Sequence, residues 1–420
     1  MSISSKVLRD QRHRQNKAKQ NTMWWNCTNK WKKSSSPSCA LSLLPDDILL
    51  NCFATVSRSD HASLSLVNKW LRSLLLSPEL YEERSLMGRT ENCIFLCLSI
   101  PSDPFVRWFA FYPKALNNRL VPIRPHLYHP QEASSVVAYG CGIYIIGGRI
   151  GGRPSSRVLF LDCRFHTWSN LPCMGVPRAY AATGVVDGKI YVFGGCQEPY
   201  SDKWGEVFDP TTQTWDVLPK RPKEPYSSVI HESVVREEKT VLALNEKGNG
   251  LLYVPSEGIW KKGKSDAYSP RRGWHVIENV MYCCVTGGRI LWCQASESEL
   301  HEPNAIKWRE VMGLKDLKDT LCASKLVNYG WGLPEEKLED LLPGHKLSNS
   351  GPNMLLFWDV LAPGKLEIWC AEISLQRRKE KGEIWGKVEW SEVVTSIDPP
   401  HPLPEHQHHC KILHALTLNL

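Results

Sequence analysis

Several features that would define a protein class are missing from this sequence of 420 residues. It contains no run of 18 apolar residues, so we expect no membrane-spanning helix. Its first residues are polar and include no apolar core segment, so we expect no secretory signal peptide. The fifteen cysteines are scattered and form no CxxC pair, which is typical of reduced thiols in the cytoplasm or nucleus.

Positive charge is concentrated in one part of the chain. The net charge is +7, but residues 1–40 hold nine lysines and arginines and one aspartate, so the remaining residues sum to about −1. Because this basic, serine-containing segment has few apolar residues, we expect it to be a disordered tail. Such a tail is compatible with nuclear import and attracts polyanions. The near-neutral remainder contains no nucleic-acid recognition motif, so we expect no direct nucleic-acid function.

Residues 41–87 have the pattern of a small helical module. A Leu-Pro-Asp-Asp sequence predicts a turn followed by a helix with acidic residues in its first turn. The apolar residues that follow fall on one helical face: Ile48, Leu49, Cys52, Phe53 and Val56. We expect Ser59-Asp60 to cap a second helix, Asn68 to begin a third, and residues 79–87 to form another. Helices this short bury little core, so the module needs a partner or the following domain for stability.

Residues 136–219 contain two copies of one unit, offset by 47 positions. The matching pairs are Tyr144 and Tyr191, Gly147-Gly148 and Gly194-Gly195, Asp162 and Asp209, Trp168 and Trp215, and Leu171-Pro172 and Leu218-Pro219. Each copy predicts about four short strands, with a glycine pair that permits a sharp turn. A sheet with two apolar faces is not stable alone, so we expect the copies to stack around an axis as blades of a β-propeller.

Weaker copies extend this pattern along the chain. Trp260 lies 45 positions after Trp215, and Trp308 lies 48 positions after Trp260. Together with strand-like runs, this spacing predicts six blades, with five or seven left open, at about 92–124, 134–173, 179–220, 226–262, 273–311 and 320–395. The first of these has only three strand-like runs. We expect the alternating segment 411–420 to supply its missing strand and close the ring, which would remove exposed sheet edges.

The repeat resembles the kelch motif, in which a double glycine follows a hydrophobic strand and an aromatic residue follows at a set distance. The residues that carry this resemblance are Gly147-Gly148, Trp168, Gly194-Gly195 and Trp215. Residues 43–84 resemble an F-box, and the combination resembles the plant family of F-box/kelch-repeat proteins. The resemblance implies a mainly β protein in which a disordered tail (1–40) and a small all-α F-box (41–87) precede a kelch-type β-propeller of about six blades (91–420).

The family implies a function in protein ubiquitination. In this family, the F-box docks the Skp-type adaptor of a cullin–RING ubiquitin ligase, and the propeller binds a target protein for proteasomal degradation. The resemblance therefore implies that this chain is the substrate-recognition subunit of an SCF-type ligase. Such a receptor does no chemistry itself, so no catalytic residue, metal or cofactor is expected. The F-box positions that dock the adaptor or hold the fold correspond to Leu44, Pro45, Ile48, Leu49, Val67 and Trp70. For Val67 and Trp70, packing in the core explains the residue as well as adaptor contact does.

The substrate surface is expected on one face of the propeller, where loops adjoin the inner strands. Arginine and tryptophan are common anchors of protein interfaces. The candidates at these positions are Arg149, Arg153, Arg178, Arg272 and Trp274. Arg178 and Arg272 have an alternative, structural role as ion-pairing residues between blades.

Other functions also fit a kelch propeller. A copper-radical oxidase would need a Tyr–Cys crosslink and two histidine ligands, but the histidines here are dispersed. The cluster His401, His406, His408, His409 and Cys410 contains zinc-binding residue types, yet its proline-rich setting favours a solvated loop. A non-ligase interaction scaffold, or a degenerate paralogue with eroded blades, is also open.

Overall fold

The computed structural model divides into two units between Leu49 and Leu50. The predicted tail at 1–40 and the histidine cluster at 401–410 lie outside the residues that the structure describes. Those residues are 44–100, 103–113, 119–197, 202–221, 229–245, 247–266, 272–285, 288–294, 306–321, 345–362, 365–378, 380–397 and 411–420.

Four short helices precede the strands. They are α2 (Asp46–Ala54), α3 (Arg58–Ser65), α4 (Lys69–Leu75) and α5 (Pro78–Leu86). The expected cap for α3 was wrong: Ser57 is the N-cap and its hydroxyl accepts from the Ser59 amide, while Asp60 lies in the first turn, where the helix dipole favours it. Asn68 caps α4 as expected, with its Oδ1 2.7 Å from the Leu71 amide nitrogen.

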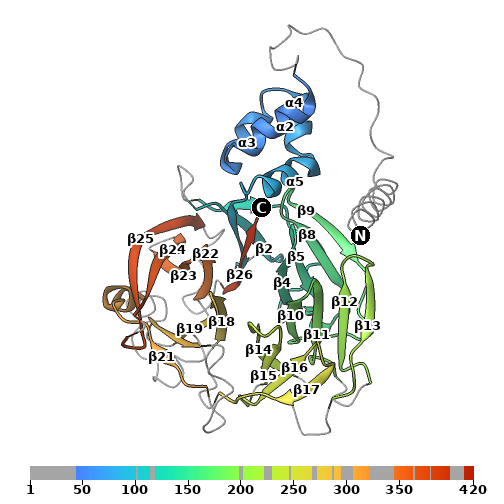
Figure 1. Ribbon diagram of the computed structural model, residues 1–420, viewed down its shortest axis with the longest axis vertical. Coiled ribbons are helices and arrows are strands. Elements are labelled where there is room, and N and C mark those ends of the chain that lie inside the picture. Colours follow the sequence, from blue (N-terminus) through green and yellow to red (C-terminus); the bar gives the residue numbers. More distant parts are fainter. Residues whose placement is uncertain are drawn as a thin grey trace, which may run out of the picture. The chain divides into compact units, whose positions relative to one another are not determined.

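The rest of the described chain forms six antiparallel four-stranded sheets arranged around a common axis (Figure 1). The expected six-bladed, mainly β propeller is therefore confirmed. The strands of each blade are given from the inside outwards. Blades 1 and 2 consist of β26 (Lys411–Asn419), β1 (Asn92–Ser99), β2 (Arg107–Phe111) and β3 (Val121–Ile123), and of β4 (Ser135–Tyr139), β5 (Gly142–Ile146), β8 (Val158–Asp162) and β9 (Thr167–Leu171). Blades 3 and 4 consist of β10 (Ala182–Val186), β11 (Lys189–Phe193), β12 (Gly205–Asp209) and β13 (Thr214–Val217), and of β14 (Ile230–Val235), β15 (Val241–Asn245), β16 (Gly250–Val254) and β17 (Ile259–Lys262). Blades 5 and 6 consist of β18 (Arg272–Ile277), β19 (Val280–Val285), β20 (Arg289–Gln294) and β21 (Arg309–Glu310), and of β22 (Lys346–Ser350), β23 (Asn353–Ala362), β24 (Lys365–Arg378) and β25 (Glu383–Ile397).

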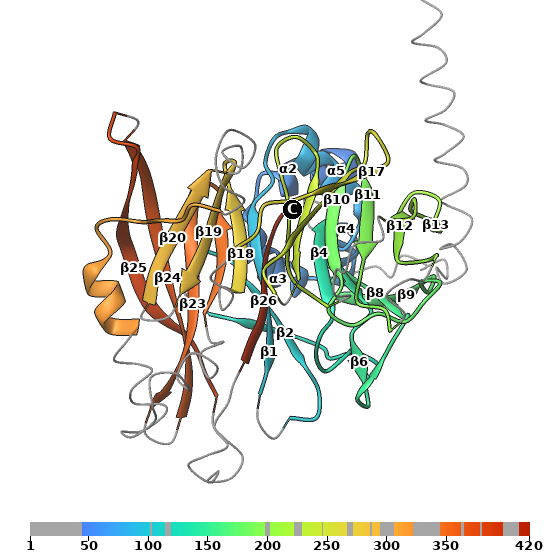
Figure 2. The ribbon, with the colours of Figure 1, turned by 90° about the horizontal axis from the view of Figure 1, so that it is seen from below.

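The last strand of the chain lies in the first blade. β26 pairs antiparallel with β1, and the two strands lie side by side in Figure 2. Glu91 and Leu420 exchange two backbone hydrogen bonds of 2.7 and 2.9 Å where these strands end. Each inner strand contacts the next around the axis, in the order β26, β4, β10, β14, β18 and β22, and β22 contacts β26 again. The ring is therefore closed by contacts between residues that are far apart in sequence.

Side-chain hydroxyls connect neighbouring inner strands near the axis. Ser135 Oγ donates to the Ala181 carbonyl at 2.7 Å, beside β4 and β10. Between β10 and β14, Ser233 Oγ accepts from the Thr183 amide and donates to the Thr183 carbonyl, at 3.0 and 3.1 Å. Ser348 and Thr417 share a 2.8 Å hydrogen bond between β22 and β26. These bonds satisfy polar groups at places where no strand ladder continues.

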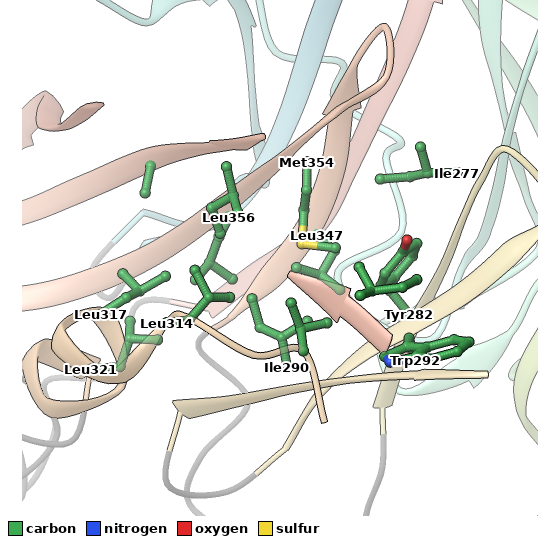
Figure 3. Close-up of a cluster of buried hydrophobic side chains, with 14 of the residues drawn as sticks. Ile277, Tyr282, Ile290, Trp292, Leu314, Leu317, Leu321, Leu347, Met354 and Leu356 are labelled. Carbon is green, nitrogen blue, oxygen red and sulfur yellow. The ribbon is translucent and has the colours of Figure 1, made fainter. Parts of the chain in front are cut away.

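Apolar side chains pack between the blades. One such cluster joins Trp292 of β20 to Met354 of β23 (Figure 3). It also contains Leu314, Leu317 and Leu321, because residues 315–321 form a helical turn at the edge of this cluster. The strand pattern of the sequence did not predict this turn.

The double glycines allow the connections between blades to pass close to the inner loops. Gly147 has φ +61°, and a Cβ there would lie 2.5 Å from the Arg178 carbonyl oxygen. In the next copy, Gly195 has φ +68°, and its Cβ would lie 2.6 Å from the Ala179 carbonyl oxygen. The repeat therefore needs glycine here for both its conformation and its close approach.

Candidate functional site

The helices expose large apolar side chains while burying others. In the first unit, Leu44 and Ile48 are exposed. In the second unit, the exposed apolar residues of the helices are Leu66 (76%), Val67, Leu76, Leu86 (80%) and Met87, whereas Leu71, Leu74, Leu75 and Leu80 are buried. Single exposed apolar residues are ordinary, but this many on so short a helical segment is typical of a surface that binds another protein.

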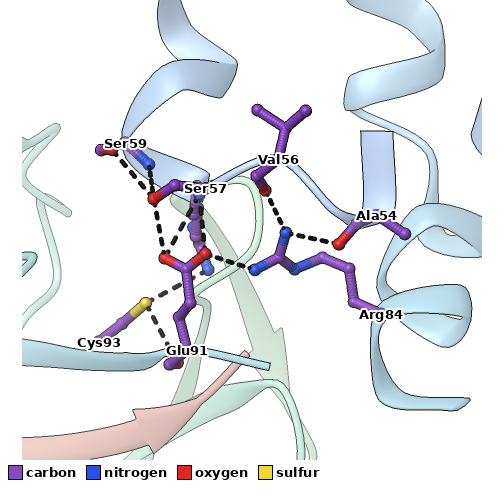
Figure 4. Close-up of polar contacts among 8 residues, drawn as sticks. Ala54, Val56, Ser57, Ser59, Arg84, Glu91 and Cys93 are labelled. Carbon is purple, nitrogen blue, oxygen red and sulfur yellow. Dashed lines mark hydrogen bonds and ion pairs between the residues drawn. The ribbon is translucent and has the colours of Figure 1, made fainter. Parts of the chain in front are cut away.

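The Glu91 carboxylate organises a polar network beside these helices (Figure 4). It accepts hydrogen bonds from Ser57 Oγ at 3.2 Å and from the Arg58 amide at 3.1 Å, so it supports the first turn of α3. It also pairs with Arg84 Nη2 at 2.7 Å. The other Arg84 nitrogen, Nη1, donates to the carbonyls of Ala54 and Val56, which satisfies the end of α2. One carboxylate and one buried guanidinium therefore connect α2, α3, α5 and the start of blade 1.

Arg58 extends this network into blade 2. Its buried guanidinium donates to the carbonyls of Cys163 (2.5 Å) and Arg164 (3.1 Å), in the turn between β8 and β9. It also lies over the rings of Tyr81 and Tyr112, at 5.4 and 5.6 Å from their centroids. A guanidinium has several donors in a fixed plane, so it can satisfy two carbonyls and stack on aromatic faces at once.

The thiols near this network are not suited to chemistry. Burial raises the pKa of the Cys93 thiol to about 11, although the Arg58 guanidinium nearby lowers it. Burial also raises the pKa of Cys163 well above its usual range. Both thiols are therefore protonated at neutral pH, and a thiol rather than a thiolate is a poor nucleophile.

The connections of the propeller divide between two faces, because successive strands of each blade run in opposite directions. The turn face carries the tight turns between first and second and between third and fourth strands, including residues 163–166, which Arg58 reaches. The linker face carries the loops between second and third strands and the segments that join one blade to the next. Residues 124–134, 147–157 and 172–181 belong to the linker face.

The sequence matches known family models over both parts. The F-box domain model matches residues 41–83, and the model described as "FKB95, Kelch-repeats domain" matches residues 108–395, which is more than half of the chain. The chain belongs to the F-box/kelch-repeat family. The strands and exposed helices described above are therefore those of a kelch propeller and an F-box.

Relatives in Arabidopsis thaliana match most of the F-box/kelch chain. One F-box/kelch-repeat protein is 37% identical over 389 residues, which covers 84% of this chain and 90% of that protein. Another is 36% identical over 379 residues, with coverages of 88% and 93%. A third is 33% identical over 427 residues, with coverages of 94% and 96%. A solved structure described as "Structure of YjhT" covers 69% of this chain and 99% of its own at 12% identity, but its TM-score of 0.42 is too low to support an argument.

The six predicted F-box residues differ in exposure. Leu44, Pro45, Ile48 and Val67 are exposed, and Trp70 is half-buried. Leu49 is only 1% exposed, so its side chain packs in the interior rather than offering a surface. The three other exposed leucines, at 66, 76 and 86, were not singled out from the sequence. Their positions relative to the helix ends decide their exposure, and the sequence placed those ends only approximately.

The five predicted propeller residues are also divided. Arg149 and Arg153 lie on a short hairpin of the linker face, formed by β6 (Arg149–Ile150) and β7 (Arg153–Pro154), and both are at least partly exposed. Trp274, in β18, is buried, so it is not part of an exposed surface. Arg272 begins β18, and its side chain lies outside the described part of the structure.

Arg178 lies on the linker face but points into the protein. Its guanidinium is 1% exposed and donates to the carbonyls of Gly194 (2.7 Å), Trp204 (2.8 Å) and Lys203 (2.5 Å). It also pairs with the Glu206 carboxylate at 2.7 Å, and Glu206 accepts from the Gly175 amide as well. This geometry corresponds to the structural alternative, in which Arg178 joins the link between blades 2 and 3 to blade 3.

Three exposed residues of the linker face were missed. Tyr128, Arg157 and Tyr180 adjoin the predicted arginines in blade 2. A signal was present in the repeat, because Tyr180 occupies the position that Ala133 holds 47 residues earlier. Because alanine holds the equivalent position in the other copy, the blade fold does not require an aromatic residue there. Tyr180 is therefore a candidate for binding rather than for folding.

Within the described ranges, no group of three or more histidine, cysteine or acidic residues could hold a metal ion. In the same ranges, no helix is both long and apolar enough to cross a membrane. The described surfaces offer apolar side chains on the F-box, and arginine and tyrosine on the linker face.

Proposed function

We propose that this chain is the substrate-recognition subunit of an SCF-type cullin–RING ubiquitin ligase, acting in the cytoplasm or nucleus. The F-box docks a Skp-type adaptor, and the linker face of the propeller binds a target protein. The chain performs no catalytic step; it raises the effective concentration of the target's lysines near the ubiquitin-charged enzyme. The observation that carries this proposal is the set of large apolar side chains left exposed on a helical module of the F-box family.

The adaptor contacts are assigned to the exposed F-box residues. Leu44, Pro45, Ile48 and Val67 offer apolar surface, and Trp70 contributes its exposed edge. Leu49 supports them from the interior. Burying such side chains in an interface contributes about 1–3 kcal/mol each. The substrate contacts are assigned to Arg149 and Arg153 in blade 2 and to Arg272 at the start of β18 in blade 5. The buried residues Arg178 and Trp274 support these two regions from the interior.

The adaptor assignment is tested by co-purification. The full-length chain should capture a Skp-type adaptor, and the double variant Leu44→Ala/Pro45→Ala should weaken this capture by about tenfold or more, since two contacts in an interface core are removed. Ile259→Ala is the matched control, because Ile259 is an apolar residue of the propeller with 40% exposure, against 41% for Leu44. Circular dichroism should show that both variants remain folded.

Two outcomes would contradict the proposal. The first is failure of the folded wild-type chain to bind the adaptor, which would favour a non-ligase scaffold. The second is equal adaptor binding by Leu44→Ala/Pro45→Ala and the wild type, which would place the contact elsewhere. Copper or zinc in stoichiometric amount in the purified protein would instead favour an enzyme.

A further inference from the structure

A cluster of arginine and tyrosine side chains lies on the linker face of blade 2. It consists of Tyr128, Arg149, Arg153, Arg157 and Tyr180, and we call it the arginine–tyrosine patch. Tyr128 is 54% exposed, Tyr180 41%, and the Arg149 side chain 41%; Arg153 and Arg157 are exposed as well. Interfaces are enriched in these two residue types, because both provide a large contact area together with directional polar groups.

Backbone hydrogen bonds hold the patch in a fixed arrangement. Arg149 donates to the Glu132 carbonyl at 2.9 Å and accepts from the Gln131 amide at 3.0 Å, so the hairpin is fixed to the segment before blade 2. The Tyr180 amide donates to the Ala133 carbonyl at 3.0 Å, which adds the segment before blade 3. Three separate segments therefore form one rigid platform, and little conformational entropy is lost when a ligand binds.

The aromatic rings orient the arginines without neutralising them. The Arg157 guanidinium carbon lies 4.7 Å from the Tyr128 ring centroid, and that of Arg149 lies 5.8 Å from the Tyr180 ring centroid. Such cation–π contacts are worth about 0.5–1 kcal/mol at exposed sites. The positive charges stay available for a partner while their side chains are held in place.

The patch is positively charged, although residues 41–420 as a whole sum to about −1. Residues 124–157 contain four arginines and one acidic residue, Glu132. Glu132 lies 4.0 Å from Arg149 with both side chains exposed, which is a weak pair. Within the described ranges, no ion pair joins Arg153 or Arg157 to a carboxylate. The patch therefore has charge that the described residues do not balance.

The repeat provides an internal control for the role of these residues. In the next blade, the positions equivalent to Arg149, Arg153 and Arg157 hold Cys196, Tyr200 and Trp204. Ala133, at the position equivalent to Tyr180, has φ +59°, close to the +60° of Tyr180. The blade fold is therefore built without arginine at these three positions, and the left-handed conformation is adopted without tyrosine at position 133. We infer that the patch residues are present for what they bind.

We propose that the arginine–tyrosine patch binds a carboxylate-rich segment of a polypeptide, which would be the recognition element of the substrate. This step rests on the proposed receptor function, because only a receptor has a substrate to select. Arginine forms short, charge-assisted and bidentate hydrogen bonds with carboxylates. The tyrosine rings and the exposed Leu127 beside them provide an apolar surface for the side chains between the acidic ones. The partner is thus an acidic segment that also contains apolar residues.

The experiment is selection from a phage-displayed library of random 12-residue peptides on the full-length chain. Peptides enriched on the wild type should be rich in Asp and Glu, and the Arg153→Glu/Arg157→Glu variant should fail to enrich them. A synthetic copy of the most enriched peptide, labelled with fluorescein, should bind this variant at least tenfold more weakly in fluorescence anisotropy. Its binding to the wild type should weaken as salt increases. Lys261→Glu is the matched control, because it reverses an exposed charge on β17, the outer strand of blade 4, and should leave binding unchanged.

Several results would overturn the proposal: no enrichment, enrichment of neutral or basic peptides, or equal binding by the patch variant. Selective binding of phosphorylated peptides or of a single-stranded oligonucleotide, with no binding of the acidic peptide, would also overturn it. Adaptor binding measured in parallel separates the two proposals. Loss of the adaptor with retained peptide binding contradicts the ligase role alone, and the reverse contradicts the patch alone.

Discussion

At the scale of single residues, two buried arginines have the same role: each satisfies main-chain carbonyls in loops. Arg58 and Arg178 each donate to main-chain carbonyls in loops, where no strand partner is present. Buried carbonyls without a partner are costly, and the planar guanidinium can satisfy several at once. Lysine has a single charged nitrogen, so it would leave part of each set unsatisfied.

Replacing Arg178 should destabilise the propeller strongly. Arg178→Met should lower the free energy of unfolding by about 3–5 kcal/mol, because Glu206, 3% exposed, would remain as a buried charge without its partner. Urea unfolding followed by tryptophan fluorescence measures this change. Arg149→Met is the control and should stay within about 0.5 kcal/mol, since Arg149 is exposed. A similar loss in both variants would contradict the structural role.

Two buried histidines should make the protein sensitive to acid. Burial lowers the pKa of His129 to about 4 and that of His414 to about 3. His129 Nδ1 lies 2.6 Å from the Pro130 carbonyl oxygen, and its Nε2 accepts from Trp108 Nε1 at 2.9 Å, so a second ring proton would face another donor. The unfolded chain takes up these protons near pH 6.5. Stability is therefore fully present above about pH 6.5 and is lost as the pH falls towards the folded pKa values.

Measurement of unfolding free energy at several pH values checks this expectation. Between pH 6.5 and 5, each histidine should reduce stability by about 2 kcal/mol. His129→Gln should reduce the slope of unfolding free energy against pH by the equivalent of about one bound proton. The glutamine amide can still accept a hydrogen bond from Trp108, but it does not titrate. An unchanged slope in this variant would mean that His129 is protonated in the fold.

At the scale of elements, α3 depends on residues outside itself. Its eight residues are too few for a stable isolated helix. Its first turn is held instead by the Glu91 carboxylate and by the Arg58 contacts with residues 163–164 of blade 2. A helix in the middle of the F-box is thus stabilised by the propeller.

Removing the Arg58 guanidinium should loosen α3 selectively. In Arg58→Met, amide hydrogen exchange should speed up in residues 58–65 and 163–166, while β14 to β17 keep their protection. Arg72→Met is a suitable control, because Arg72 lies on α4 and its contact is an exposed hydrogen bond to the Ser65 carbonyl. Uniformly faster exchange across the propeller would instead indicate general unfolding, and no change would mean that Arg58 does not hold the helix.

At the scale of the whole molecule, sequence predicted what repeats and missed what depends on distant segments. Tyr144, the double glycines and Trp168 specify a blade locally, so two blades could be identified from the repeat, and the other four were inferred from tryptophan spacing and strand-like runs. An ion-pairing role for Arg178 was one of two alternatives, but its partners could not be predicted, because Trp204 and Glu206 surround it only after blade 3 has formed. The exposure of Leu66 depends in the same way on where α3 ends. For the candidate site, loop position and residue type indicated Arg149 and Arg153, whereas the contact between Arg157 and the Tyr128 ring became visible only in three dimensions.

The closed ring predicts that the chain cannot dispense with its last strand. Without residues 411–420, blade 1 would keep three strands, and β1, buried along most of its length, would expose its edge and apolar residues to solvent. The truncated chain should aggregate or lose its cooperative thermal transition, as followed by circular dichroism and light scattering. A synthetic peptide of residues 411–420 should restore part of the transition.

In the full chain, Ile412→Asp should be severely destabilising and Lys411→Asp nearly neutral, because Ile412 is buried and Lys411 exposed. Tolerance of both the truncation and Ile412→Asp would contradict this role.

The position of β26 also sets an order in time. During synthesis, β1 emerges more than 300 residues before the strand that completes its sheet. The edge of β1 therefore stays unpaired until β26 has left the ribosome. Contacts between such distant residues form slowly and leave intermediates open to chaperones and proteases. A prematurely terminated chain would carry the F-box helices but not a finished propeller, and its open blade would expose it to proteases.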